Sequence, residues 1–235
     1  MRLSFVIPSF NCAEFLPHAV DSCLKQTYKD IEVVIVNDAS TDSTRDYLDW
    51  LGEQPCASKI KIIHNETNRG RSRSRNVGNA AATGEIIAVL DADDISTVKR
   101  AEITVAKFRS GSKFVHGEAY MMDAVGRNLG LMRTDVFNRE SARESLLNGI
   151  VHSTVAMTKE LALEFPYSEG IASRIGCDDW EQQTCMAAEG VKFDYIPAPL
   201  CAYRHGVGIS SQRNEDEVRK FKTDFLAAFK VEVPA

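Results

Sequence analysis

The chain has 235 residues, a formal net charge of −5, and hydrophobic and charged fractions of 44% and 26%. This length is enough for one α/β domain with a full core, and the acidic balance gives no indication of nucleic-acid binding. The longest apolar runs have about five residues, far fewer than the ~20 that a membrane span requires.

Strand and helix patterns alternate regularly through the first 95 residues. Short apolar runs predict buried strands, and apolar residues at helical spacing predict helices between them. The predicted elements are strands at 3–8, 31–36, 60–64 and 86–90 and helices at 14–26, 44–51 and 71–82. This order favours a mostly parallel sheet with right-handed crossovers and flanking helices, which is a Rossmann-like α/β fold.

The pattern is less regular after residue 95. The predicted elements there are helices at 97–108, 140–147, 178–189 and 216–229 and strands at 113–122, 192–197 and 200–204. A stretch rich in Gly and Ser, 206–214, is predicted to form a mobile loop. The chain therefore divides into a regular half, residues 1–95, and an irregular half, residues 96–235, that could determine which ligand is recognised.

Six cysteines are scattered along the chain without any Cys-x-x-Cys pair. The apolar segment at the start of the sequence is too short and too interrupted for a signal peptide. We therefore expect free, mostly buried thiols and a cytoplasmic protein.

Three carboxylates follow the predicted strand 86–90 within four residues: Asp91, Asp93 and Asp94. Open α/β sheets bind their ligands at the carboxyl ends of their strands, so these side chains are expected at a binding edge. Carboxylates this close repel one another, and a divalent cation is the simplest way to relieve the repulsion. Oxygen ligands favour Mg²⁺ or Mn²⁺ over zinc. The alternative is a strand-to-helix turn whose aspartates cap the following helix.

Asp38 stands just after the predicted strand 31–36, at the same edge of a parallel sheet. A carboxylate in this place can accept hydrogen bonds from a nucleobase N–H or a ribose hydroxyl. In the alternative interpretation Asp38 only shapes the turn, and Asp42 caps the next helix.

Four arginines alternate with other residues before and within the predicted helix 71–82: Arg69, Arg71, Arg73 and Arg75. A guanidinium near the acidic edge could bind a diphosphate or a base carbonyl bidentately. For three of the four a solvated basic surface is the better interpretation. Arg75 is the exception, because it lies deepest in the segment.

Two further aspartates, Asp178 and Asp179, open the predicted helix 178–189. Capping and the helix dipole explain one acidic residue at a helix start, but they do not readily explain two beside Trp180. One of the pair could act as a general base toward an acceptor hydroxyl. The structural and the catalytic interpretation both remain open at this point.

His205 precedes the Gly-rich stretch and is a candidate metal ligand, although a lone histidine is more often structural or exposed. The other histidines show no ligand spacing. The sequence also has no Walker motif, no Gly-x-Ser-x-Gly and no Gly-x-Gly-x-x-Gly after a strand. These absences argue against phosphate-loop enzymes and nicotinamide dehydrogenases.

Five segments, in the same order along the chain, resemble the family 2 inverting glycosyltransferases, which have the GT-A fold. They are Val6-Ile7-Pro8-Ser9-Phe10-Asn11 with Glu14, Val36-Asn37-Asp38-Ala39-Ser40-Thr41-Asp42, Asn68-x-Gly70-x-Ser72-x-Ser74-Arg75-Asn76-x-Gly78, Leu90-Asp91-Ala92-Asp93-Asp94, and Cys177-Asp178-Asp179-Trp180-Glu181. The resemblance spans residues 3–181, and five collinear segments are far more specific than one. It implies a GT-A domain in which residues 1–95 bind a nucleotide-sugar and residues 96–235 bind the acceptor.

The resemblance implies an enzyme that moves one sugar, with inversion, from a nucleotide-sugar to a hydroxyl of a saccharide or glycolipid acceptor. A UDP-sugar is the expected donor, and bacterial-type surface polysaccharide or glycoconjugate synthesis is the expected setting. Asp179 matches the general base, and Asp93 and Asp94 match ligands of Mn²⁺ or Mg²⁺, to which His205 is added as a candidate. The other expected donor-binding residues are Pro8, Phe10, Asn11, Glu14, Asp38, Arg75, Asp91 and Ala92, with Asp93 shared between donor and metal.

The chain departs from the family pattern in several places. Asn37 and Ala39 stand where Asp and Gly are commoner, which leaves Asp38 as the one expected nucleobase contact, and Asp178 replaces the usual Glu. The Gln-x-x-Arg-Trp element of processive polysaccharide synthases is absent, which favours transfer of one sugar at a time. We expect no nucleic-acid partner and at most peripheral membrane contact, and the sequence leaves the oligomeric state open.

Two other classes of protein remain as alternatives. A sugar nucleotidyltransferase also joins an α/β sheet to acidic metal ligands, but it needs a glycine-rich, basic loop directly after the first strand. Residues 8–15 are neither glycine-rich nor basic. A non-catalytic module would bind a nucleotide with a metal and show no turnover.

Overall fold

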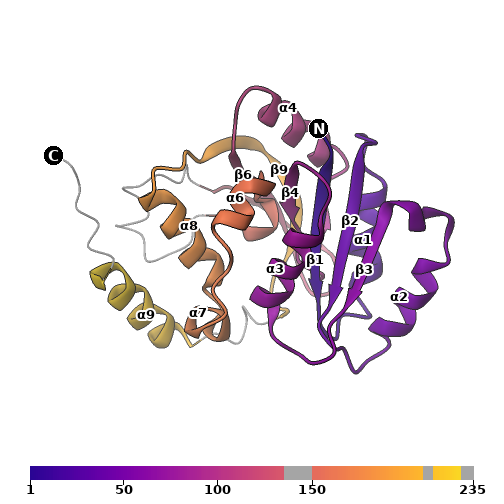
Figure 1. Cartoon of the computed structure of the whole chain (residues 1–235), viewed down its shortest axis with the longest axis horizontal. Helices are drawn as coiled ribbons and strands as arrows, with labels where there is room; N and C mark the ends of the chain where they lie inside the picture. Colours follow the sequence, from indigo (N-terminus) through magenta and orange to yellow (C-terminus); the bar gives the residue numbers. More distant parts are fainter. Residues whose placement is uncertain (135–149, 209–213, 229–235) are drawn as a thin grey trace.

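A computed structural model describes residues 1–134, 150–208 and 214–228. Through these residues runs one nine-stranded sheet with helices packed on both faces (Figure 1). The strands are β1 (Leu3–Ser9), β2 (Ile31–Asn37), β3 (Ile60–His64), β4 (Ile86–Val89), β5 (Ile95–Ser96), β6 (Phe114–Met122), β7 (Asn128–Met132), β8 (Ala156–Thr158) and β9 (Asp194–Arg204). The helices are α1 (Leu16–Leu24), α2 (Thr44–Gly52), α3 (Arg71–Ala81), α4 (Arg100–Arg109), α6 (Lys159–Glu164), α7 (Ile171–Ile175), α8 (Asp178–Ala188) and α9 (Glu215–Ala228), with 3₁₀ turns at Pro55–Lys59 and His152–Thr154.

The sheet has the order β3-β2-β1-β4-β8-β6-β9-β5, and β7 pairs with β6. Strands β1 to β4 are parallel, which confirms the order predicted for the first half. Leu3 of β1 lies opposite both Ile31 and Ile86, so these three strands end at the same edge. The segments after β1, β2 and β4, which carry the predicted donor residues, therefore meet at one place.

Alternate residues of the central strands face two helical layers. Phe5 and Ile7 pack into a cluster with side chains of α1, α2 and α4, whereas Val6 packs into a cluster that includes α6 and α8. Helix α3 also covers this second face. A Cβ on Gly78 would lie 2.5 Å from Cγ1 of Val6, so α3 lies directly against β1 and only glycine fits at this position.

The irregular half differs most from the sequence prediction. The short elements β5, β7, β8, α6 and α7 were not predicted. The strands predicted at 192–197 and 200–204 are one strand, β9. Its two prolines, Pro197 and Pro199, lie at the register shift between β6 and β9, where the ladder is already irregular. The predicted helix 140–147 lies outside the described residues, as do residues 209–213 of the predicted loop.

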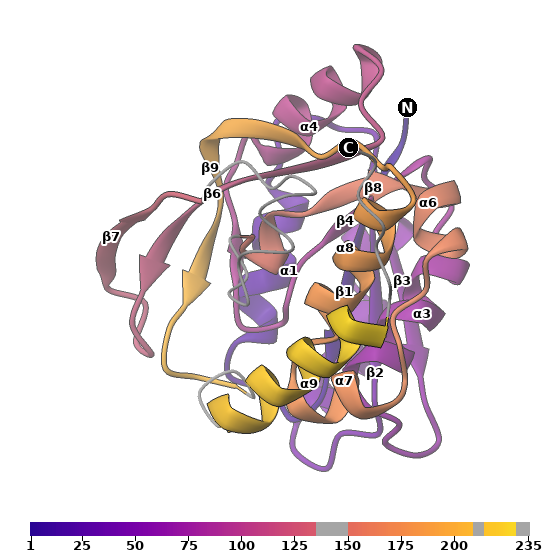
Figure 2. The same cartoon turned by 90° about the vertical axis from the view of Figure 1, so that its left-hand side faces the viewer.

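Strands β6 and β7 form a hairpin at the side of the molecule (Figure 2). Tyr120 lies opposite Leu131 in this pair, so these two side chains share one face, while Leu129 lies at a register shift between the strands. All three are at least 40% exposed. The opposite face of the hairpin carries Ala119, which is buried, and Met132.

All six cysteines are free thiols, as predicted, and half of them are buried. Among the described helices, none combines the length and the apolar character needed to cross a bilayer.

Candidate active site

The loops after β1 and β2 are joined by hydrogen bonds at the carboxyl edge of the sheet. The Asp38 N–H donates to the Ser9 carbonyl (2.8 Å), and the Asn11 side-chain oxygen accepts from the Thr41 N–H (2.8 Å). Ala39 has φ 59°, in the left-handed region that strains a residue with a Cβ. A glycine would relieve this strain, which explains why glycine is the commoner residue in the segment that this loop resembles.

Asp38 is 3% exposed, and its carboxylate accepts hydrogen bonds from the segment before α3. Oδ2 accepts from the Gly70 N–H (2.7 Å), Oδ1 accepts from Asn65 Nδ2 (2.7 Å), and the Arg69 N–H donates to both oxygens. Asp38 therefore anchors the start of α3 to the end of β2. Its contact with a nucleobase stays a prediction.

Arg71 and Arg75 lie on one face of α3 and bind the first aspartate of α8. Arg71 Nε donates to Oδ1 of Asp178 (2.9 Å), and Arg75 Nη1 and Ser72 Oγ donate to its Oδ2 (2.8 and 2.9 Å). Asp178 is fully buried. Burial raises the pKa of this carboxyl, but the two guanidinium groups outweigh burial and hold its pKa below the usual range.

Arg75 also connects α8 to the end of β4. Its Nη2 donates to Oδ1 of Asp91 (2.6 Å), and the guanidinium lies over the ring of Tyr167, 5.3 Å from its centre. Burial raises the pKa of Asp91, but Arg75 outweighs burial and holds it at about 2. The repulsion expected among three carboxylates is thus relieved in part by an arginine, which corrects the view that a cation alone relieves it.

His152 lies beside this ion-pair network. It is 8% exposed, and its Nε2 is 3.0 Å from the Tyr167 hydroxyl. Burial, and secondarily the charge of Arg75, lower the pKa of His152 to about 4, so the ring is neutral near pH 7.

Asp93 and Asp94 have a different environment. Oδ1 of Asp94 accepts from the main-chain N–H of Arg204 (2.8 Å), and the buried Oδ2 has no partner within hydrogen-bond distance in the described part of the chain. The Ser153 hydroxyl is nevertheless near enough to lower the pKa of this carboxyl, against the larger effect of burial. Burial and the neighbouring carboxylates raise the pKa of Asp94 well above its usual value, and burial and Asp91 raise that of Asp93 to about 6. An orphaned oxygen among unneutralised carboxylates fits a bound cation.

Within the described ranges, no group of three or more His, Cys, Asp and Glu side chains converges to form a metal site. His205 is exposed, and its predicted role as a ligand stays a prediction. Among the described residues, the turn after β4 thus has two carboxylates, Asp93 and Asp94, where a cation could bind, and not a full cage. Mg²⁺ is often bound in this way, by one or two carboxylates together with phosphate oxygens of the substrate.

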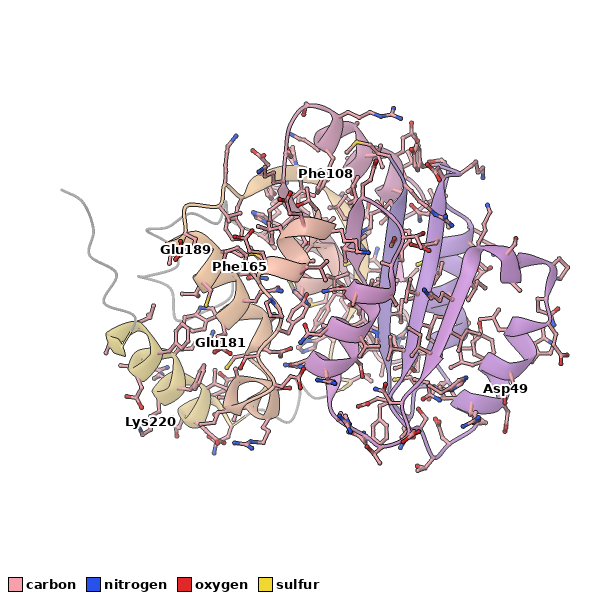
Figure 3. All side chains as sticks on the ribbon, in the orientation of Figure 1. Asp49, Phe108, Phe165, Glu181, Glu189 and Lys220 are labelled. Carbon is pink, nitrogen blue, oxygen red and sulfur yellow. The ribbon has the colours of Figure 1, made fainter. Side chains whose placement is uncertain are left out.

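A pocket of about 220 Å³ adjoins the ion-pair network. It is lined by Arg71, Arg75, Asp91, Met132, Ile150, Val151, His152, Ser153, Asp179 and Tyr203. Successive helical residues point about 100° apart, so Asp178 faces the arginines while Asp179 lines the pocket. Oδ1 of Asp179 accepts from the Trp180 N–H (2.8 Å). Glu181 on helix α8 lies on the opposite side of the molecule from Asp49 on α2, and Lys220 on α9 lies farther out (Figure 3).

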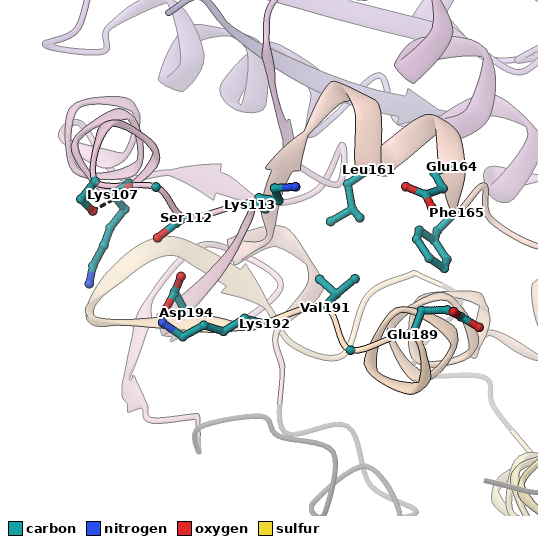
Figure 4. Close-up of a pocket in the computed structure, with 13 residues that line it drawn as sticks. Lys107, Ser112, Lys113, Leu161, Glu164, Phe165, Glu189, Val191, Lys192 and Asp194 are labelled. Carbon is teal, nitrogen blue, oxygen red and sulfur yellow. Dashed lines mark hydrogen bonds and ion pairs between the residues drawn. The ribbon is translucent and has the colours of Figure 1, made fainter. Parts of the chain in front are cut away.

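A second hollow, of about 710 Å³, lies where β6 and β9 begin (Figure 4). Leu161, Phe165 and Val191 contribute apolar side chains to it, and Lys192 pairs with Asp194 at its margin (2.8 Å). None of the predicted site residues lines this hollow. The smaller pocket, which contains predicted site residues, is therefore the candidate active site.

The structure changes the interpretation of some predicted residues and adds others. Arg71 was expected to be solvated, but it is an ion-pair partner of buried Asp178. His152 and Tyr203 line the pocket and were missed, since neither stands in a recognisable motif. The remaining predicted donor residues lie at the same edge: Pro8 and Ala92 are buried, and Phe10, Asn11 and Glu14 are exposed.

The sequence model described as Glycosyl transferase family 2 matches residues 4–161. An uncharacterized glycosyltransferase of Nostoc is 36% identical over 174 residues, which are 74% of this chain and 51% of the relative. The chain thus spans about half the length of that relative. The amylovoran biosynthesis glycosyltransferase AmsB of Erwinia amylovora is 28% identical over 98% of this chain and 78% of its own length.

Solved structures show the same fold. S. aureus TarS in complex with UDP-GlcNAc superposes with a TM-score of 0.76 at 19% identity, over 100% of this chain and 68% of that chain. At this identity the likeness concerns the fold alone, and it confirms the expected GT-A architecture.

Proposed function

The chain belongs to glycosyl transferase family 2, and on this premise we propose that it transfers one sugar from a UDP-sugar to an acceptor hydroxyl with inversion. The proposed acceptor is a saccharide or glycolipid of bacterial surface polysaccharide synthesis. The description of the relative AmsB as an enzyme of amylovoran biosynthesis supports this acceptor class. UDP is proposed because the segments around Asp38 and Arg75 resemble the nucleotide-binding segments of the family.

One observation carries the proposal: Asp179 shares a pocket with Asp91, next to the turn that bears Asp93 and Asp94. A base for the acceptor and a site for the donor diphosphate are thereby close together. The ion pairs of Asp178 and Asp91 with Arg75 hold α8 and the end of β4 in fixed relation before any substrate binds. Such preorganisation is a main source of rate enhancement in enzymes.

In the proposed reaction Asp179 accepts the proton of the acceptor hydroxyl as that oxygen attacks the anomeric carbon. A divalent cation held by Asp93 and Asp94 would supply positive charge to the leaving diphosphate. Retention through a covalent intermediate would need one carboxylate as nucleophile beside another as acid and base. Asp91 and Asp178 are engaged by arginines, which supports inversion with Asp179 as the single base.

The test is to incubate the purified chain with a panel of nucleotide-sugars and saccharide acceptors, with Mn²⁺, with Mg²⁺ or with EDTA. Release of UDP and formation of a glycosylated product are measured. We expect turnover with a UDP-sugar only when a divalent cation is present. Asp179→Asn should lose about 10²-fold or more in turnover with donor affinity nearly unchanged.

Asp216→Asn is the matched control, because Asp216 also stands in the first turn of a helix, α9, but is exposed. This variant should keep wild-type turnover. Pyrophosphate release from a nucleoside triphosphate and a sugar phosphate would instead identify a nucleotidyltransferase. Metal-dependent nucleotide binding without even slow donor hydrolysis would identify a binding module.

A further inference from the structure

We propose that Arg204 is a positioning residue that holds the turn of Asp93 and Asp94 in the orientation needed to bind a divalent cation with the donor diphosphate. The inference rests on the proposed function, because it assigns these two aspartates to the cation. Arg204 ends strand β9 and is 4% exposed, although the two residues that follow it, His205 and Gly206, are exposed.

Arg204 contacts the aspartate turn through both its main chain and its side chain. Its N–H donates to Oδ1 of Asp94 (2.8 Å), and its Nε donates to the main-chain carbonyl of Asp93 (2.9 Å). The first bond orients a carboxylate, and the second fixes the peptide that joins the two aspartates. The orientation of both side chains therefore depends on the position of Arg204.

The same side chain joins this turn to two other segments around the site. Nη1 donates to the main-chain carbonyls of Ala124 (2.8 Å) and Asp123 (3.3 Å), in the turn between β6 and β7. The guanidinium also lies over the ring of Phe15, 4.7 Å from its centre, next to the predicted donor loop 8–14. Arg204 thus connects the aspartate turn, the hairpin turn and the start of α1.

The hydrogen bonds of the Arg204 side chain leave the carboxylates available to a cation. Its side chain donates to main-chain carbonyls, and it forms no ion pair with a carboxylate in the described ranges. Its positive charge nevertheless lowers the pKa of Asp93, against the larger effect of burial. Oδ2 of Asp94 has no partner within hydrogen-bond distance among the described residues, so its lone pairs are open to a cation. Groups that orient metal ligands in this way typically contribute 10- to 100-fold to metal affinity.

The test compares Arg204→Gln and Arg204→Lys with wild type. Mn²⁺ binding is measured directly by electron paramagnetic resonance without nucleotide, and UDP binding is measured by calorimetry with Mn²⁺ and with EDTA. We expect Arg204→Gln to weaken Mn²⁺ binding by about 10- to 100-fold. Arg204→Lys keeps the charge but cannot form the planar fork, so a loss of about 10-fold is expected. UDP affinity in EDTA should be unchanged in both variants.

Arg127→Gln is the matched control, because Arg127 lies in the same hairpin turn, is 80% exposed and pairs with nearby Asp123. It should bind Mn²⁺ as wild type does. If Arg204→Gln does not fold, as thermal unfolding in EDTA reports, the decision rests on Arg204→Lys. If a folded Arg204 variant binds Mn²⁺ with wild-type affinity, the inference about Arg204 is wrong, and the proposed metal site is unaffected. Failure of the wild-type chain to bind Mn²⁺ with UDP overturns the proposed metal site, and the inference with it.

Discussion

Two pairs of aspartates at one edge of the sheet differ in how their charge is balanced. Asp91 and Asp178, the arginine-paired aspartates, share Arg75, and Arg71 also pairs with Asp178. Burial raises both pKa values, but the nearby positive charges together outweigh burial and hold them low. Asp93 and Asp94, the turn aspartates, form no ion pair in the described ranges, and burial together with neighbouring carboxylates raises their pKa values.

The comparison shows two uses of negative charge in one site. The charges of the arginine-paired aspartates are balanced without a ligand. Their ion pairs hold helix α8, and with it Asp179, against the end of β4. No ion pair in the described ranges balances the charge of the turn aspartates, so the protein disfavours their charged form. Substitutions in the two pairs should therefore have opposite effects on stability when no metal is present.

The largest effect is expected from Asp178→Asn. The substitution leaves Arg71 and Arg75 near a neutral side chain in the interior, and breaking a buried ion pair costs about 3–5 kcal/mol of unfolding free energy. Urea denaturation in EDTA measures this loss. Glu169→Gln is the matched control, because Glu169 pairs with Arg73 at the surface and should contribute less than about 1 kcal/mol. Equal losses in the two variants would contradict the contrast between buried and exposed pairs.

Asp94→Asn tests the other pair. It should weaken Mn²⁺-dependent UDP binding by about 100-fold, since losing a ligand costs at least as much as losing a group that orients one. In EDTA the variant should be at least as stable as wild type, because an unpaired buried carboxylate is removed. Calorimetry and urea denaturation measure the two quantities, with Asp49→Asn, at an exposed site on α2, as the control. A clear loss of stability in EDTA would show that the turn aspartates are structural.

His152 lies beside the arginine-paired aspartates, and its buried ring should make the stability of the chain depend on pH. The pKa of this ring falls from 6.5 in the unfolded chain to about 4 in the fold, so only the unfolded chain gains a proton between these values. Stability is therefore lost as the pH falls from 6.5 toward 4, by up to about 1.4 kcal/mol per pH unit. His152→Gln should flatten this slope in urea titrations, whereas a substitution of exposed His18 should leave it unchanged. An unaltered slope in His152→Gln would refute a buried neutral ring.

The smallest effect concerns the loop that carries Asp38, a carboxylate balanced by N–H groups instead of arginines. Ala39→Gly relieves a left-handed backbone that costs about 1–2 kcal/mol, against an entropy cost of about 0.5–1 kcal/mol for glycine. A net gain of about 0.5 kcal/mol is expected in urea denaturation. Ala80→Gly, on the exposed side of α3, should instead destabilise the chain. A loss in Ala39→Gly would mean that the loop carries no such strain.

The sequence predicted the first half of the fold well because its signals are local. Each apolar run in β1, β2 and β4 is buried on both faces and is bounded by polar residues. The register that aligns Leu3 with Ile31 and Ile86 brings their ends together without further information. The place of the aspartates after β2 and β4 was predictable for the same reason.

The second half could not be predicted from local signals, because its elements pair with segments that are far away in the sequence. Strand β8 has only three residues, and it exists because β4 and β6 pair with it on either side. Arg71 looked solvated because its partner, Asp178, lies 107 residues further along the chain. His152 carried no motif, and only the fold brings it next to Tyr167 and Arg75. Long-range pairing of this kind leaves no periodic trace in a sequence.

Strand β7 matters for how the purified chain can be handled. Its five residues include no charged side chain and no proline, which are the usual protections of an edge strand against pairing with another molecule. Leu129 and Leu131 are exposed on it, so concentrated samples are expected to associate through this hairpin during storage or crystallisation. Leu131→Lys, on the face opposite Met132, which lines the pocket, would keep the preparation monodisperse without touching the site.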